Sequence, residues 1–202
     1  KWPFSEVASL RGTTTLRNDR IVYLAMDDQN LKKPHDYQYW GGAKIEYVFD
    51  NTLKKGLNLY TGMRFKIFGE YFRQLDKKDA DMYVVGADFR HYQKIHRNII
   101  WANRLAGSTS FGNQKLIYYM GGVDNWLAPK FDLSIPIATD QNYAYQTLAT
   151  NMRGFKQNIR NGNSFAVINS ELRFPMFRYF FSKPIKSDFI NSPTASWSVI
   201  TA

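Results

Sequence analysis

The feature that most constrains the fold is a period-two alternation of apolar and polar side chains over long segments. In a β-strand successive side chains point to opposite faces, so an alternating segment builds one apolar face and one polar face. The clearest segment, residues 60–72, sets Phe65 and Ile67 against Arg64 and Lys66. The pattern predicts seven strands, at residues 5–17, 20–26, 43–50, 60–72, 81–93, 98–111 and 164–174. We therefore expect an all-β, antiparallel fold.

The length of these segments distinguishes between kinds of β-sheet. The clear ones run for about 10 to 13 residues, close to the ~9–11 residues of a tilted membrane-crossing strand, whereas strands of soluble proteins average about five or six. Tyr and Trp also collect near the strand ends, as in an interfacial girdle, at Trp40, Tyr60, Tyr71, Tyr92 and Trp101. The segments therefore predict a transmembrane β-barrel, and a soluble sandwich or lipocalin-like barrel is the alternative.

A barrel of this kind has an apolar face toward lipid and a polar face toward its lumen. The residues that we expect to face lipid are Met63, Phe65, Ile67, Tyr83, Val85, Phe89, Trp101, Leu105 and Leu172. The charged residues that we expect to face the lumen are Lys44, Glu46, Arg64, Lys66, Glu70, Asp88, Arg90, Arg104 and Arg173.

Composition narrows the class further. Aromatic residues make up 16% of the chain while the apolar total is 44%, and no apolar run approaches the ~18 residues of a transmembrane helix, so a helical membrane protein is excluded. The net charge of +10 is scattered rather than gathered in runs, which argues against a nucleic-acid-binding arm. Scattered cations suit a polar lumen, an anionic membrane surface or an ordinary solvated surface.

The predicted connections alternate in length. Residues 17–20 and 94–97 read as tight turns, whereas 27–38, 73–80 and 112–162 are longer and polar. Outer-membrane barrels have short periplasmic turns and longer extracellular loops. The tight turns are therefore expected in the periplasm and the long loops outside the cell.

Catalytic and metal-binding chemistry is not expected. The chain has no cysteine, and its three histidines, His35, His91 and His96, have no acidic partner at a useful spacing. The acidic pairs at 27–28 and 79/81 lack the spacing and central glycine of a calcium loop. We expect no enzyme activity, no cofactor and no metal.

Two motifs carry a resemblance to a known family. The 112–162 connection contains Asn-Met-Arg-Gly-Phe at 151–155, and the strand after it ends in Ser-Glu-Leu-Arg-Phe-Pro at 170–175. Together they resemble the BamA/TamA superfamily of bacterial outer-membrane barrels, in which a long extracellular loop with an Arg-Gly-Phe or Arg-Gly-Tyr tip precedes a Glu-Leu-Arg-Phe-Pro-like strand end. Residues 47–62 resemble the periplasmic turn of that family three strands earlier. The resemblance places the chain at about the sixth to the twelfth of about sixteen strands.

Two further stretches of the sequence resemble one subfamily of these barrels. Residues 87–92 and 121–126 are similar to barrels that are fused behind a TolB-like β-propeller. The family has a further acid in an Asp-x-Gly stretch of the next strand, which this chain lacks after 186–190, and residues 191–202 depart from the family. That departure suggests truncation or an omitted segment. The start at Lys1, with no signal-peptide core, suggests a processed product or an interior piece, so residues 1–202 are expected to be part of one barrel domain.

The resemblance implies roles for the loop tip. Arg153 would reach the barrel wall, Gly154 would permit the tight turn, and Phe155 would pack the tip. Glu171, on the lumen face by alternation, is the first candidate partner for Arg153, because an arginine can hold a carboxylate with two parallel hydrogen bonds.

The resemblance also implies a function. The chain would assist insertion of outer-membrane proteins, or translocation of substrates, in the bacterial outer membrane, without a cofactor. Its partners would be outer-membrane lipid and lipopolysaccharide, client outer-membrane proteins, and accessory periplasmic or lipoprotein subunits. A passive structural or channel-forming barrel subunit and a soluble ligand-binding barrel are the alternatives.

Overall fold

The computed structural model describes residues 1–21, 36–56, 58–76, 80–97, 99–124, 127–137, 142–175 and 194–201. Within these ranges the chain is all-β, with twelve strands. The described residues include no helix of the length and apolar character needed to cross a membrane.

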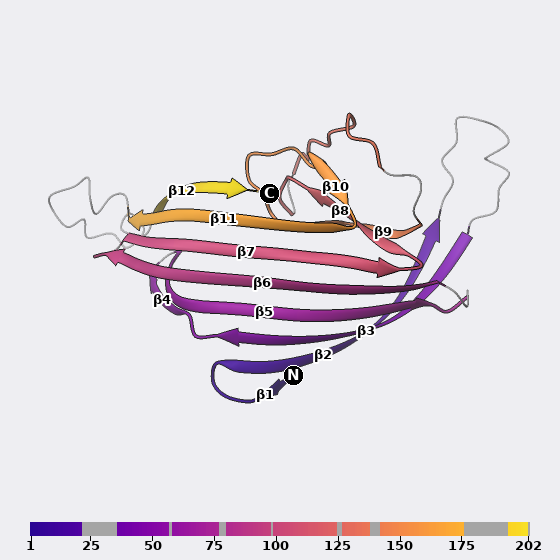
Figure 1. Ribbon diagram of the computed structural model, residues 1–202, viewed down its shortest axis with the longest axis horizontal. Coiled ribbons are helices and arrows are strands. Elements are labelled where there is room, and N and C mark those ends of the chain that lie inside the picture. The colour runs from indigo at the N-terminus through magenta and orange to yellow at the C-terminus, as the bar shows by residue number, and fades with distance from the viewer. Residues whose placement is uncertain are drawn as a thin grey trace.

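One long antiparallel sheet dominates the fold. Its strands are paired in the order β1-β2-β3-β5-β6-β7-β11-β12, and the short β4 pairs with β5. Figure 1 shows these strands side by side in a curved sheet, with the amino-terminal strands at one edge and β12 at the other, and the sheet is a half-barrel. The bounds of the strands are β1 Trp2–Pro3, β2 Ala8–Ile21, β3 Asp36–Asp50, β4 Leu53–Gly56, β5 Leu59–Gln74, β6 Asp81–His96, β7 Ile99–Gly112, β11 Ser164–Pro175 and β12 Thr194–Thr201.

A second, three-stranded sheet forms within the longest connection. It comprises β8 (Lys115–Met120), β9 (Tyr143–Leu148) and β10 (Arg160–Gly162) in the order β10-β8-β9, with β8 and β9 parallel. Leu116 and Tyr118 of β8 pack against Met82 and Val84 of β6. We call the face of the long sheet that β8 covers the inner face, and the opposite face the outer face.

The prediction that 112–162 is a polar loop was wrong in part. Residues 116–120 are all buried, and Met152 is only 1% exposed. The alternation test missed β8 because a strand that is buried on both faces is apolar throughout rather than alternating.

The prediction of a tight turn at 17–20 was also wrong. Residues 17–20 continue β2, and each pairs with one of residues 37–40 of β3. The polar run that suggested a turn lies in a strand whose alternation is weak, because Thr13, Thr14 and Thr15 interrupt it. Of the expected strand at 20–26 and the expected loop at 27–38, residues 22–35 lie outside the described ranges.

The other predicted connections agree better with the structure. β6 ends at His96 and β7 begins at Ile99, and Arg97 between them has a positive φ of 44°. The chain therefore turns tightly close to the predicted place, but residues 94–96 belong to β6, so the turn comes later than the predicted 94–97. The pairing is antiparallel, and therefore the β2–β3, β5–β6 and β7–β11 connections all begin and end at one end of the sheet (Figure 1). We call this the loop end, and we call the opposite end, where β6 ends and β7 begins, the turn end.

Candidate functional site

The two faces of the long sheet have opposite chemistry. All nine side chains that were expected to face lipid lie on the outer face, and eight of them are at least 38% exposed, with Phe65 half-buried. The register keeps this face continuous from strand to strand, because Phe65 lies opposite Phe89, which lies opposite Leu105, which lies opposite Ile168. The outer face is therefore a contiguous apolar surface without a covering layer in the described structure.

Aromatic side chains lie across the outer face near the loop end. Tyr71 contacts Tyr83 with 5.0 Å between ring centroids, and Tyr83 stacks on Phe111 at 5.5 Å, which makes a row across β5, β6 and β7. Near the turn end, the Trp101 indole N–H donates to Ser170 Oγ at 2.7 Å, and the Ser170 hydroxyl donates to Asn103 Oδ1 at 2.9 Å. These three polar side chains of the outer face are thus hydrogen-bonded to one another.

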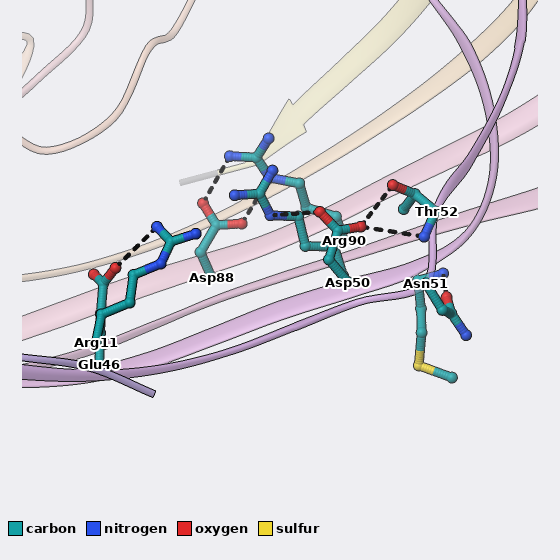
Figure 2. Close-up of polar contacts among 9 residues, drawn as sticks. Arg11, Glu46, Asp50, Asn51, Thr52, Asp88 and Arg90 are labelled. Atoms are coloured by element: carbon teal, nitrogen blue, oxygen red, sulfur yellow. Dashed lines mark hydrogen bonds and ion pairs between the residues drawn. The ribbon is translucent and has the colours of Figure 1, made fainter. Parts of the chain in front are cut away.

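The inner face carries the charged residues, and most of them are paired. Lys44 contacts both Glu70 and Glu46, and Glu46 also accepts a hydrogen bond from Arg11 at 3.3 Å. Asp50 lies 3.6 Å from Arg64 and accepts hydrogen bonds from the backbone N–H and hydroxyl of Thr52. In Figure 2, Glu46 and Asp50 are drawn with Arg11 and Thr52 respectively, along one side of the sheet. The role of Arg11 was missed from the sequence because it lies in the weakly alternating β2.

Asp88 is the centre of the most extensive charged contact. Its carboxylate accepts hydrogen bonds from Nε and Nη2 of Arg90, at 2.8 and 3.1 Å, and from Nε and Nη2 of Arg104, at 3.1 and 2.6 Å. The Asp88 side chain is 14% exposed, and the two arginines are 36% and 26% exposed. Figure 2 shows the Asp88 carboxylate beside Arg90. Hydrogen bonds between charged groups are stronger than neutral ones, so Asp88 fixes the orientation of both arginines.

The expected pair between Arg153 and Glu171 is not formed. Glu171 accepts two hydrogen bonds from Arg173, at 2.6 and 2.8 Å, while Arg153 is exposed. Arg173 is two residues from Glu171 on the same face of β11, so it reaches the carboxylate without any movement of the loop. Gly154 has a φ of +87°, which agrees with its expected role in a tight turn, but Phe155 is 39% exposed rather than packed.

The small sheet is attached to the inner face by apolar and polar contacts. Tyr118 packs edge-on against Phe165 and its hydroxyl lies 2.9 Å from Ser108 Oγ. Ser110 Oγ accepts a hydrogen bond from the Leu116 N–H at 2.9 Å. Burial raises the pKa of the Tyr118 hydroxyl, so it stays protonated at neutral pH. These contacts hold the connection against β6, β7 and β11.

The remaining candidate histidine and aspartate residues do not form a metal site or a catalytic site within the described residues. His91 and His96 lie on β6, while His35, Asp27, Asp28 and Asp79 fall outside the described residues. In the part of the chain that the structure describes, no three His, Asp or Glu residues come together as metal ligands would.

We compared the chain with protein families, curated proteins and solved structures. No protein-family model matches the chain, and no curated protein or solved structure matches it.

Proposed function

We propose that this chain is a section of a transmembrane β-barrel of the bacterial outer membrane. The observation that carries the proposal is the distribution of polarity over the long sheet. Apolar side chains such as Ile67 and Leu105, each 52% exposed, lie on the uncovered outer face, while charged side chains are paired on the inner face. Large exposed apolar surfaces mark sites of contact with protein or lipid. A sheet in water would carry the reverse arrangement.

The height of the apolar surface supports the same proposal. On β7 the outer face runs from Trp101 to Phe111, ten residues further along the strand. At ~3.3 Å per residue this is ~33 Å along the strand. A tilt of about 40° reduces it to ~25 Å across a membrane, which is the height of the apolar band of outer-membrane barrels.

For the function of the barrel, we propose the BamA/TamA type, which assists insertion of outer-membrane proteins or passage of substrates across the outer membrane. Two features support this choice: the resemblance carried by residues 151–155 and 170–175, and the packing of the long connection against the inner face. Lipid, lipopolysaccharide and client proteins would be the partners.

A passive barrel subunit is the second candidate, and one observation favours it. Arg153, the loop-tip arginine, is exposed, and Glu171 is already occupied by Arg173. The chain therefore departs from the arrangement that the resemblance implies.

Single cysteines would test the membrane proposal, because this chain has none of its own. Ile67→Cys and Leu105→Cys would place a probe on the outer face, and Lys66→Cys and Ala106→Cys, their neighbours in the chain, on the inner face. With the full protein in vesicles, an environment-sensitive fluorophore on the outer-face cysteines should be quenched by brominated acyl chains, and the inner-face cysteines should not. Equal quenching of both sets, or quenching of neither, would refute the proposal.

The choice between an insertion factor and a passive barrel needs an experiment in cells. Depletion of an insertion factor lowers the amounts of many outer-membrane proteins, whereas depletion of a passive subunit leaves them unchanged. Quantitative proteomics of outer-membrane fractions after depletion would separate the two functions. Complementation with Arg153→Ala would then show whether the loop tip is needed.

A further inference from the structure

We propose that the inner face holds a binding site for a phosphate-class oxyanion, built on a row of three arginines. Arg64 of β5 lies directly opposite Arg90 of β6, and Arg90 lies directly opposite Arg104 of β7. Asp50 of β3 and Asn169 of β11 complete the row on its two sides. The row thus crosses five strands and presents three guanidinium groups side by side.

Such a row is unfavourable without an anion. Like charges that lie directly opposite on neighbouring strands repel each other, and these three arginines make two such contacts in succession. Asp88 offsets part of the repulsion for Arg90 and Arg104, whereas the ion pair of Arg64 within the described residues is with Asp50, at 3.6 Å. Lys66, next to the row, has no ion pair among the described residues and lies 5.2 Å from the Phe68 ring.

The local charge indicates the class of ligand. Arg64, Lys66, Arg90 and Arg104 contribute four positive charges, and Asp50 and Asp88 contribute two negative charges, so the site has a net charge of +2. A phosphate group carries about −1.5 to −2 at neutral pH, which matches this value better than the single charge of a carboxylate does. Planar guanidinium groups also bind phosphate oxygens in pairs.

The hydrogen bonds to Asp88 leave donors free for the ligand. Asp88 engages Nε and Nη2 of both arginines, which leaves Nη1 of Arg90 and of Arg104 outside these hydrogen bonds, and Arg90 also interacts with the Tyr92 side chain. Asp88 is therefore a positioning residue that fixes two donors without consuming them. The covered part of the inner face begins toward the loop end, where Phe68 packs against the Met82 cluster, so the row remains open toward the turn end.

The direction of entry rests on the proposed function, because only in a barrel would the turn end open to the periplasm. Binding itself does not depend on it. Calorimetric titration of the full protein in detergent with inorganic phosphate, at low ionic strength, measures the site directly. Glycerol phosphate and acetate are the comparison ligands. Preference for glycerol phosphate over inorganic phosphate would indicate a lipid headgroup as the natural ligand, and the reverse order would indicate free phosphate.

We expect saturable phosphate binding that Arg90→Gln and Arg104→Gln each weaken about tenfold or more, because each removes a charge-assisted hydrogen bond. Arg104→Lys should weaken it less, since the charge remains but the planar fork is lost. Arg11→Gln, on the same face but paired with Glu46 outside the row, should bind as the unmodified protein does. Circular dichroism and heat modifiability on gels would check that each variant is folded.

The proposal is overturned if phosphate shows no saturable binding at about 10 mM, if acetate binds as tightly, or if the folded Arg90→Gln and Arg104→Gln variants keep full affinity. These outcomes are independent of the membrane test. A protein whose Leu105→Cys probe contacts lipid but which binds no phosphate would retain the proposed barrel and lose only the oxyanion site.

Discussion

Substitution of Leu105 by arginine is the sharpest test of which medium the outer face contacts. Leu105 lies near the middle of β7, between Phe89 and Ile168 on the neighbouring strands, and is 52% exposed. Because about half of Leu105 is exposed on the uncovered outer face, an arginine at this position can extend away from the sheet. The environment of the outer face therefore decides the effect on stability.

The two environments predict different magnitudes. An arginine on the lipid face of a barrel costs about 2–4 kcal/mol at the bilayer midplane and about 0–1 kcal/mol near an interface. A substitution at an exposed site in water changes stability by less than about 0.5 kcal/mol. His96→Arg, at the exposed end of β6, is the matched control, because it places the same side chain at the expected interface.

The free energy of unfolding of both variants can be measured by titrating the full protein in phospholipid vesicles with guanidinium chloride and following tryptophan emission. We expect a loss of about 2–4 kcal/mol for Leu105→Arg and of about 0–1 kcal/mol for His96→Arg. If both variants stay within about 0.5 kcal/mol of the unmodified protein, the outer face does not contact hydrocarbon. Equal large losses would contradict the predicted dependence on depth.

Three further substitutions test the inner face in the same unfolding assay. Asp88→Asn should lower the free energy of unfolding by about 1–2 kcal/mol, because it leaves Arg90 and Arg104 without a carboxylate while both stay partly hydrated. An unchanged free energy of unfolding would mean that water satisfies the two arginines as well as Asp88 does. Tyr118→Phe removes the hydrogen bond to Ser108, so it should cost about 0.5–1.5 kcal/mol and make residues 113–163 more sensitive to protease. Tyr143→Phe is the control, because the Tyr143 hydroxyl makes no hydrogen bond within the described structure, and it should change neither the stability nor the sensitivity to protease. Gly86→Val should cost about 1–3 kcal/mol, since its Cβ would lie 2.5 Å from the Phe68 ring. Gly69→Val should be tolerated, because a Cβ at Gly69 would have nothing within 4 Å. Equal effects of the two substitutions would mean that Phe68 does not pack tightly against Gly86.

The sequence predicts the fold well where a strand has two different faces. The strands at 60–72, 81–93, 98–111 and 164–174 agree with β5, β6, β7 and β11 to within a few residues. It fails at β8, which is buried on both sides, and it ends the strand at 5–17 too early, because β2 runs from Ala8 to Ile21 and its threonines remove the contrast between faces. Period-two reasoning detects a difference between faces, so it cannot find a strand that lacks one.

The candidate site, too, could be predicted from the sequence only in part. Alternation alone assigns the nine charged residues expected in the lumen to the inner face, since the side-chain period of a strand is two. It cannot say which charges pair, because pairing depends on register between strands: Arg64, Arg90 and Arg104 form a row only through the offsets of β5, β6 and β7. The Arg153–Glu171 pair came from a family resemblance and ignored Arg173, which was already within reach of the carboxylate.

The polarity of the inner face also explains where the long connection packs. Met82 and Val84 are apolar residues on the face that alternation assigns to water, and both are at most 2% exposed because β8 covers them. Beyond this cover the inner face changes to Asp88, Arg90 and Arg104. The apolar side chains mark the area that the connection keeps dry, and the charges mark the area that water reaches. A connection that left the inner face would expose Met82 and Val84 to water and would leave Ser110 without its bond to β8, so the small sheet is a fixed part of the inner face rather than a loop that swings away from it.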